Sequence, residues 1–143
     1  MFDTFEEKVK EFIDEYVKGN LLKEDEVFDG NFVWGKKMGN GTYRSPEGDI
    51  YYGYFENDII QGVGIKIFKN HSHFSVYWGD FIKNELKGSG VIWLKNGMMI
   101  DCIFENSEVK DALVEAWIKY PNGELYVGKF KHYRRTGGKG TLY

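Results

Sequence analysis

Hydrophobic and polar positions alternate along most of the chain, and one arrangement recurs within that alternation. An aromatic residue is followed two positions later by glycine, then by phenylalanine after two more, and a Gly-x-Gly comes after a short spacer. The clearest copy is Tyr77-Trp78-Gly79-Asp80-Phe81 followed by Gly88-Ser89-Gly90. A period of two is the pattern of a β-strand. Each copy therefore predicts two strands joined by a turn.

Four copies of this arrangement are well formed, and the fourth of five along the chain is degenerate. In the degenerate copy Cys102 stands in place of the first glycine, and Val114 and Ala116 stand in place of the Gly-x-Gly. The repeat-defining glycines of the other copies are Gly30, Gly39, Gly41, Gly53, Gly62, Gly64, Gly79, Gly88, Gly90, Gly128, Gly138 and Gly140. The copies recur every 23 to 26 residues, and a period of that length indicates a repeat array.

Each copy is predicted to be a β-hairpin. The hairpins are expected at residues 27–48, 50–69, 76–97, 99–122 and 125–143. Turn residues such as Asn57-Asp58 and Asn106-Ser107 fall in the spacers, where they tolerate a left-handed backbone. Within each motif we expect the two aromatics on one face and the glycine on the opposite face, where a ring or backbone can approach closely. A single hairpin is marginally stable, so the copies are expected to stack.

This combination of motifs resembles the MORN (membrane occupation and recognition nexus) repeat over residues 27–143. The resemblance implies a mainly β fold, an elongated twisted antiparallel sheet of stacked hairpins with a groove lined by aromatic side chains. It also implies a scaffold or accessory module and not an enzyme. Copies two and four each carry three extra residues, and copy four has lost its glycines. We expect the groove to be less regular there.

Residues 2–18 are predicted to form an amphipathic α-helix, because their apolar residues follow the i, i+3, i+4 spacing. The apolar stripe consists of Phe2, Phe5, Val9, Phe12, Ile13, Tyr16 and Val17. Asp3 and Glu6 have the spacing of a capping box, and Gly19 is a natural stop. Residues 1–26 are thus expected to be a helix with its linker, and 27–143 the array. We expect the helix to cap the first strand; alternatively its stripe docks on a partner or a second copy.

Composition limits the remaining possibilities. The chain has 143 residues, 17% aromatic residues, 18 glycines and a net charge of −3. It has no apolar run long enough to span a membrane and no recognisable secretory signal. A single cysteine, Cys102, allows no internal disulfide. These features predict a cytoplasmic protein, with a peripheral membrane position left open.

Charge is segregated between the two ends of the chain. Residues 1–29 contain ten acids and four bases, whereas residues 129–143 contain no acid. The basic residues at that end are Lys129, Lys131, Arg134, Arg135 and Lys139. This cluster is a candidate contact for anionic lipid headgroups. It could equally be a solvated turn or the complement of the acidic end of another copy, and the acidic remainder argues against nucleic acid.

Residue types that carry catalysis are sparse and scattered. Cys102 replaces a repeat glycine, so we expect a buried, neutral thiol and not a nucleophile. His71 and His73 could begin a metal site, but no third ligand lies near them in sequence. The sequence therefore predicts no enzyme activity, no metal and no cofactor.

The aromatic residues are the most abundant candidate binding groups. They are Phe28, Phe32, Tyr51, Phe55, Tyr77, Phe81, Trp93, Phe104, Trp117, Tyr126 and Phe130. One interpretation makes these rings the core of a thin array; the other leaves some of them on a concave face that binds a peptide or helix. We expect a non-catalytic protein-interaction module that uses this groove or an exposed edge strand. It could also form a homodimer through the C-terminal edge strand or the helix. The alternative function is binding of anionic phospholipid.

Overall fold

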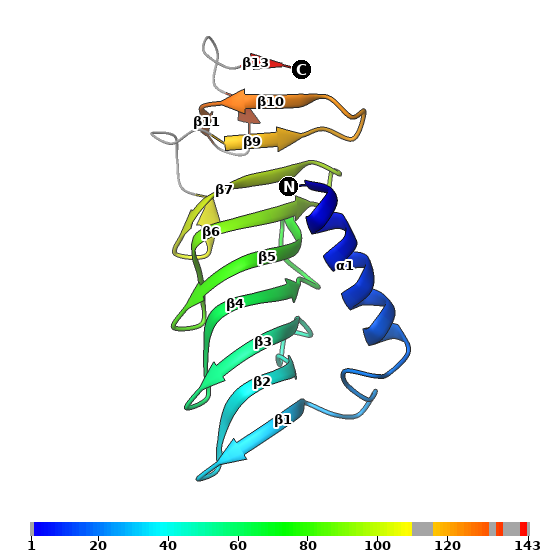
Figure 1. The fold of residues 1–143 in the computed structure, drawn as a ribbon, viewed down its shortest axis with the longest axis vertical. Coiled ribbons are helices and arrows are strands. Elements are labelled where there is room, and N and C mark those ends of the chain that lie inside the picture. Colours follow the sequence, from blue (N-terminus) through cyan, green and yellow to red (C-terminus); the bar gives the residue numbers. More distant parts are fainter. Residues whose placement is uncertain (1, 110–115, 132–133, 136–140, 143) are drawn as a thin grey trace.

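The chain forms a long antiparallel β-sheet with one helix lying across a face of it, in a computed structural model that describes residues 2–109, 116–131, 134–135 and 141–142 (Figure 1). The helix is α1 (Phe2–Val17). The strands are β1 (Phe28–Val33), β2 (Lys36–Arg44), β3 (Ile50–Glu56), β4 (Ile59–Ile67), β5 (Phe74–Ile82), β6 (Glu85–Leu94), β7 (Met99–Glu105), β8 (Glu108–Val109), β9 (Ala116–Lys119), β10 (Leu125–Gly128), β11 (Phe130–Lys131), β12 (Arg134–Arg135) and β13 (Thr141–Leu142).

The predicted mainly β fold of successive hairpins is confirmed. Strands β1 to β7 pair in sequence order, so the first three hairpins are β1–β2, β3–β4 and β5–β6. The fourth is more complex, because β7 pairs with both β8 and β9. Beyond it β10 pairs with β9 and β13, while β11 and β12 form a separate two-stranded sheet. The irregularity begins where the sequence motif degenerates.

The repeat glycines lie side by side across the sheet in one row. Consecutive strands pair Gly41 with Gly53, Gly53 with Gly64, Gly64 with Gly79, Gly79 with Gly90, and Gly90 with Cys102. Further along, Ala116 pairs with Gly128. Cys102 and Ala116 therefore occupy glycine places, as the repeat predicts. Val114, Gly138 and Gly140 lie outside the described residues.

The aromatic ring of each motif lies over glycines of its own strand and the return strand. A Cβ added to Gly79 would lie 2.5 Å from the Tyr77 hydroxyl oxygen and 2.5 Å from the Cα of Gly90. The predicted close approach is thus confirmed, but the predicted face was wrong. Positions i, i+2 and i+4 of a strand point to the same side, so the glycine shares the face of the ring that covers it.

The first glycine of each Gly-x-Gly differs from the glycines of the central row in its backbone conformation. Gly39, Gly62 and Gly88 have φ values of 76°, 81° and 98°. The pairing register shifts around these residues, which marks a β-bulge in each return strand. A left-handed backbone is open to glycine without steric cost, and a bulge increases local twist and bending. The first glycine of each Gly-x-Gly thus permits the bulge that bends the strand, and the second leaves room for the ladder ring.

Turn residues fasten each hairpin to the preceding one through pairs of hydrogen bonds. The backbone N–H of Asn84 donates to the Ile60 carbonyl at 3.0 Å, and the Ile60 N–H donates to Asn84 Oδ1 at 2.8 Å. Equivalent pairs join Asp58 to Lys37 and Ser107 to Leu86. We call Asp58, Asn84 and Ser107 the clamp residues. They align neighbouring hairpins along one side of the array.

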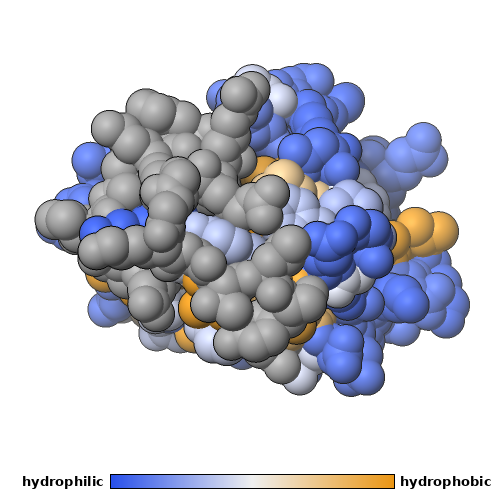
Figure 2. All heavy atoms as spheres, turned by 90° about the horizontal axis from the view of Figure 1, so that it is seen from above, coloured by the Kyte–Doolittle hydropathy of each residue, from blue (hydrophilic) through white to orange (hydrophobic). Residues whose placement is uncertain are grey.

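The face that carries the aromatic ladder is the larger core. Its buried members are Tyr51, Phe55, Phe74, Tyr77, Phe81, Leu86, Ile92, Leu94, Met98, Ile100, Cys102, Phe104, Ala116, Ile118 and Tyr126. Successive rings meet edge to face, as Tyr77 does with Phe81 at 5.3 Å and with Phe104 at 4.9 Å between centroids. Such contacts add to the free energy gained from burial. Seen from the β13 end, most of the coloured surface is hydrophilic (Figure 2).

Helix α1 covers the other face of the sheet, and the prediction that it caps the first strand was wrong. It begins beside β6 and β7 and ends near β2 and β3 (Figure 1). Its buried residues Phe2, Phe5, Val9 and Phe12 join a second core with Leu22, Ile50, Ile65, Val76, Val91 and Met99. The middle strands attract the helix because their second face is also apolar, whereas β1 is exposed at five of its six residues.

Candidate functional site

The predicted aromatic groove needs correction, because most of its rings are core residues. Tyr51, Phe55, Tyr77, Phe81, Phe104 and Tyr126 have at most 4% of their surface exposed. Phe28 is partly buried against them, Phe32 is exposed on β1, and Trp93 and Trp117 lie on the face that carries α1. The side chain of Phe130 lies outside the described residues. The ladder thus forms the core, and the groove described next lies on the opposite face.

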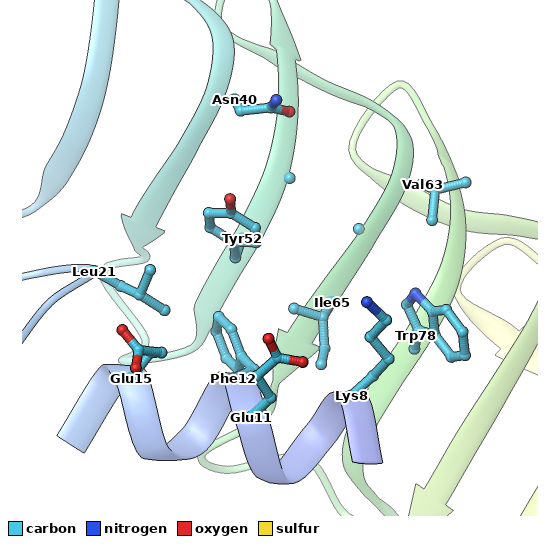
Figure 3. Close-up of a pocket in the computed structure, with 12 residues that line it drawn as sticks. Lys8, Glu11, Phe12, Glu15, Leu21, Asn40, Tyr52, Val63, Ile65 and Trp78 are labelled. Carbon is cyan, nitrogen blue, oxygen red and sulfur yellow. The ribbon is translucent and has the colours of Figure 1, made fainter. Parts of the chain in front are cut away.

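A groove of about 500 Å³ runs between α1 and that opposite face (Figure 3). We call it the helix–sheet groove. Its lining residues are Lys8, Glu11, Phe12, Glu15, Leu21, Asn40, Tyr52, Gly53, Val63, Gly64, Ile65 and Trp78. Figure 3 shows the labelled residues of α1 facing those of the strands across this space. Gly53 and Gly64 of the central row contribute backbone to its floor, because their missing side chains would point to the ladder face.

The floor of the groove is apolar and partly open to solvent. Val63 is 60% exposed and Tyr52 is 39% exposed. Two ring contacts hold the aromatic lining in place. The Tyr52 ring lies 6.0 Å from that of Phe12, and Trp78 stacks on Phe5 at 6.4 Å. The floor is thus preformed, a property that lowers the entropic cost of binding.

The wall of the groove is charged. Glu11 and Glu15 are spaced i, i+4 on α1, so they lie on one side of the helix. Glu11 is exposed, and Glu15 Oε2 accepts a hydrogen bond of 2.9 Å from the side-chain amide of Asn20. Lys8 is the only basic residue among the lining residues. An apolar floor beside two carboxylates suits a ligand that is apolar with a positive charge.

Polar contacts at both ends of α1 fix the position of the wall. Near the start of the helix Glu6 pairs with Lys119 of β9 at 3.2 Å. Near its end the Arg44 guanidinium donates to the Tyr16 hydroxyl at 3.2 Å and to the backbone carbonyls of Glu24 and Glu26. The helix is therefore tied to strands that lie far apart in the array.

Cys102 and the histidine pair form no site among the described residues. Burial raises the pKa of the Cys102 thiol to about 12, which confirms the predicted buried, neutral cysteine. The His71 ring stacks on Phe74 at 4.1 Å, and its Nδ1 accepts the backbone N–H groups of His73 and Phe74. Burial lowers the pKa of His71. Within the described ranges no group of three or more His, Cys, Asp or Glu could hold a metal ion.

The basic cluster predicted for lipid contact falls largely on residues whose side chains are not described. Lys129 follows β10 and is exposed. Lys131, Arg134 and Arg135 contribute backbone to β11 and β12, while Lys139 lies outside the described residues. Over the described part of the chain, no helix is long and apolar enough to cross a membrane.

Tyr52 and Trp78 were not among the predicted site residues, although the sequence contains a signal for them. Each follows a ladder ring directly and therefore points to the opposite face. In β5 and β6 apolar residues occupy both alternating sets of positions, for example Val76 and Trp78 beside Tyr77. A strand that is apolar on both sides is typical of a sheet covered on both faces. That pattern would have placed the helix over the middle strands.

Comparisons with known proteins agree with the repeat register. A family model described as MORN repeat matches residues 28–50, 51–73 and 77–99. The chain is also similar to Alsin of Rattus norvegicus, Mus musculus and Homo sapiens, at 27% identity over 97 residues. The similar region covers 64% of this chain and 6% of each Alsin. The likeness therefore concerns a small part of a much longer protein.

Proposed function

Because the chain belongs to the MORN repeat family through residues 28–99, a family of non-catalytic repeat modules, we propose that it is a protein-binding module. In this proposal the helix–sheet groove holds a partner segment that is apolar and carries a lysine or arginine. The observation that supports the proposal most directly is the groove itself, with Tyr52, Val63 and Trp78 in its floor and two carboxylates on its wall.

Aromatic faces and carboxylates together favour a cationic side chain. A lysine or arginine that lies over Tyr52 or Trp78 gains a cation–π interaction of about 0.5–2 kcal/mol. The same side chain can reach Glu11 or Glu15 at the wall, and residues 1–29 add a net negative charge around it. Val63 and Ile65 supply apolar contact for the neighbouring residue of the segment. The chemistry of the groove thus selects for charge and for apolar surface at once.

The size of the groove favours a short segment over a folded domain. A volume of about 500 Å³ is typical of a pocket that encloses a few side chains. Its walls come from one helix and the surface of a sheet, so an extended or helical segment can enter lengthwise. The remaining surface of a partner would lie outside the groove and contribute little to the binding free energy.

The test is selection of binders from a random peptide display library on the purified chain. We expect selected peptides to be enriched in lysine or arginine beside aromatic or aliphatic residues, and to bind with micromolar affinity in fluorescence anisotropy. Val63→Lys should weaken binding at least about tenfold, a loss of about 1.4 kcal/mol. Val17→Lys is the matched control, because Val17 is 75% exposed and lies outside the groove.

A second pair of variants tests the charge of the wall. Glu11→Lys should weaken peptide binding several-fold, whereas Glu7→Lys, on an exposed part of the same helix, should not. Loss of affinity with all four variants would show that the groove is not the site. If the library yields no binding peptide but the chain binds phosphatidylserine vesicles, the lipid alternative is favoured and the proposal is contradicted.

A further inference from the structure

Strand β1 is the first strand of the sheet and pairs only with β2 among the described residues. Helix α1 lies over the middle strands and leaves this edge open (Figure 1). One side of the β1 backbone therefore presents a row of donors and acceptors that can pair with another strand. From this edge we propose that two copies of the chain form a dimer by antiparallel pairing of β1 with β1.

The side chains at this edge are unusually apolar for an exposed position. Phe32 is 58% exposed, Val33 is 48% exposed and Trp34, in the following turn, is 98% exposed. Trp34 also holds a φ of 53°, at a turn position that other hairpins fill with Asn57, Lys83 or Asn106. Natural edges are normally protected by charge or proline. Asp29 is the only charged residue within β1.

Charge at the two ends of β1 favours an antiparallel partner. Glu24, Asp25 and Glu26 precede the strand, and the exposed Lys36 follows its turn. Antiparallel pairing brings the start of one strand to the end of the other, so the acids of each copy face Lys36 of the other. A parallel arrangement would place acids beside acids. By symmetry the favourable contact occurs twice in the dimer.

The turn of the first hairpin argues against another MORN hairpin as the occupant. In later hairpins the clamp residues Asp58, Asn84 and Ser107 bond to the preceding hairpin through their side chains. Gly35 occupies the equivalent turn position in the first hairpin and has no side chain for this contact. The edge therefore lacks a contact that joins successive hairpins, which favours twofold pairing over head-to-tail extension.

Sedimentation equilibrium of the full chain tests the dimer. A single six-residue strand with three adjoining apolar side chains makes a small interface, so we expect a dissociation constant in the micromolar to submillimolar range. Phe32→Lys with Trp34→Lys should leave a monomer of unchanged circular dichroism, because both side chains are exposed. Val63→Lys is the control, since it alters the helix–sheet groove and should leave the dimer intact.

A charge exchange tests the orientation. Lys36→Glu should weaken the dimer several-fold, and adding Glu24→Lys and Asp25→Lys should restore it. A chain that stays monomeric up to about 1 mM would overturn the proposal. So would a dimer that survives Phe32→Lys with Trp34→Lys, or one that Val63→Lys abolishes, since the groove would then be the interface. Failure of the charge exchange to restore the dimer would overturn the antiparallel arrangement.

Discussion

Gly79 lies where the strand and the ladder ring approach most closely. An added Cβ would meet the Tyr77 hydroxyl, the Gly90 Cα and the Ser89 carbonyl oxygen, all within 2.6 Å. Because two of these atoms belong to backbone, we expect Gly79→Ala to lower the free energy of unfolding by about 3 kcal/mol. Urea denaturation measures the change.

Gly62→Ala is the control for this prediction. Gly62 has open space around it, so its substitution costs only the left-handed backbone at φ 81°, about 1–2 kcal/mol. An equal or smaller loss for Gly79→Ala than for Gly62→Ala would contradict the packing described for the glycine row.

The Tyr77 hydroxyl illustrates how a ladder ring satisfies its polar group. It donates to the Asp80 carbonyl at 2.8 Å, and Tyr51 and Tyr126 donate in the same way to Tyr54 and Lys129. Tyr77→Phe should therefore cost about 1 kcal/mol at pH 7. The measurement is the midpoint of chemical denaturation.

Alkaline pH should lower the folding stability by ionising the Tyr77 hydroxyl. Burial raises the pKa of Tyr77 and of Tyr51 well above the ordinary value. A raised folded-state pKa means that stability is fully present below the unfolded pKa of about 10 and is lost as pH rises above it. Tyr77→Phe should lose less stability than the unmodified chain between pH 9 and about pH 11. Parallel losses would contradict the burial of the hydroxyl.

The ionised side chain of Asp101 lowers the folding stability at neutral pH. Burial on the helix-covered face raises the pKa of its carboxyl group, so the folded chain disfavours the ionised form. Stability should therefore increase as pH falls through the folded pKa. We expect Asp101→Asn to raise the melting temperature at pH 7, with the gain shrinking as pH falls through the raised folded-state pKa and absent below the unfolded pKa of about 4. Glu7→Gln, at an exposed position of α1 outside the groove, is the control and should leave the melting temperature unchanged at both pH values.

At the scale of elements, α1 is held mainly by its apolar stripe. Phe5 is fully buried and contacts both Trp78 and Trp93. Phe5→Ala should lower the free energy of unfolding by about 3–5 kcal/mol. Val17→Ala, at the exposed end of the helix, should change it by less than about 0.5 kcal/mol. Similar small effects of both would indicate that the helix does not rest on the sheet as described.

Sequence periodicity predicted the elements better than their arrangement. The hairpins follow from alternation and turn residues, and the equivalence of Gly30, Gly53, Gly79 and Gly128 follows from the repeat. The apolar stripe of α1 indicated that one side of the helix packs against an apolar surface, but the stripe alone does not indicate which surface. The helix rests on β3 to β7 because residues such as Trp78 and Val91 make their second face apolar, a pattern that the repeat motif does not contain.

The helix–sheet groove could not be predicted for a related reason. Its shape depends on the path of α1 across the strands, which Arg44 and Lys119 fix from opposite ends of the array. Glu15, Tyr52 and Trp78 come to line one groove only after the sheet has formed. The ladder rings, by contrast, were visible in the sequence as candidates for a groove, yet their regular spacing reflects the packing of the core.

At the scale of the whole molecule, the two faces of the sheet differ in what covers them. One face consists of rings over glycines and gives the array its stability. The other carries α1 and leaves a groove with an apolar floor and acidic wall, while β1 remains open at the end of the sheet. The groove and the edge lie on different elements, so the proposed partner segment and the proposed second copy would not compete for one surface.

The most direct test of the proposed function is a titration of the isotopically labelled chain with a selected basic peptide, followed by NMR. The groove predicts that the amide signals of Glu11, Tyr52, Val63 and Trp78 shift together and saturably, while those of β1 and of the residues after β10 do not. Shifts confined to β1, or to the basic residues after β10, would contradict binding in the groove.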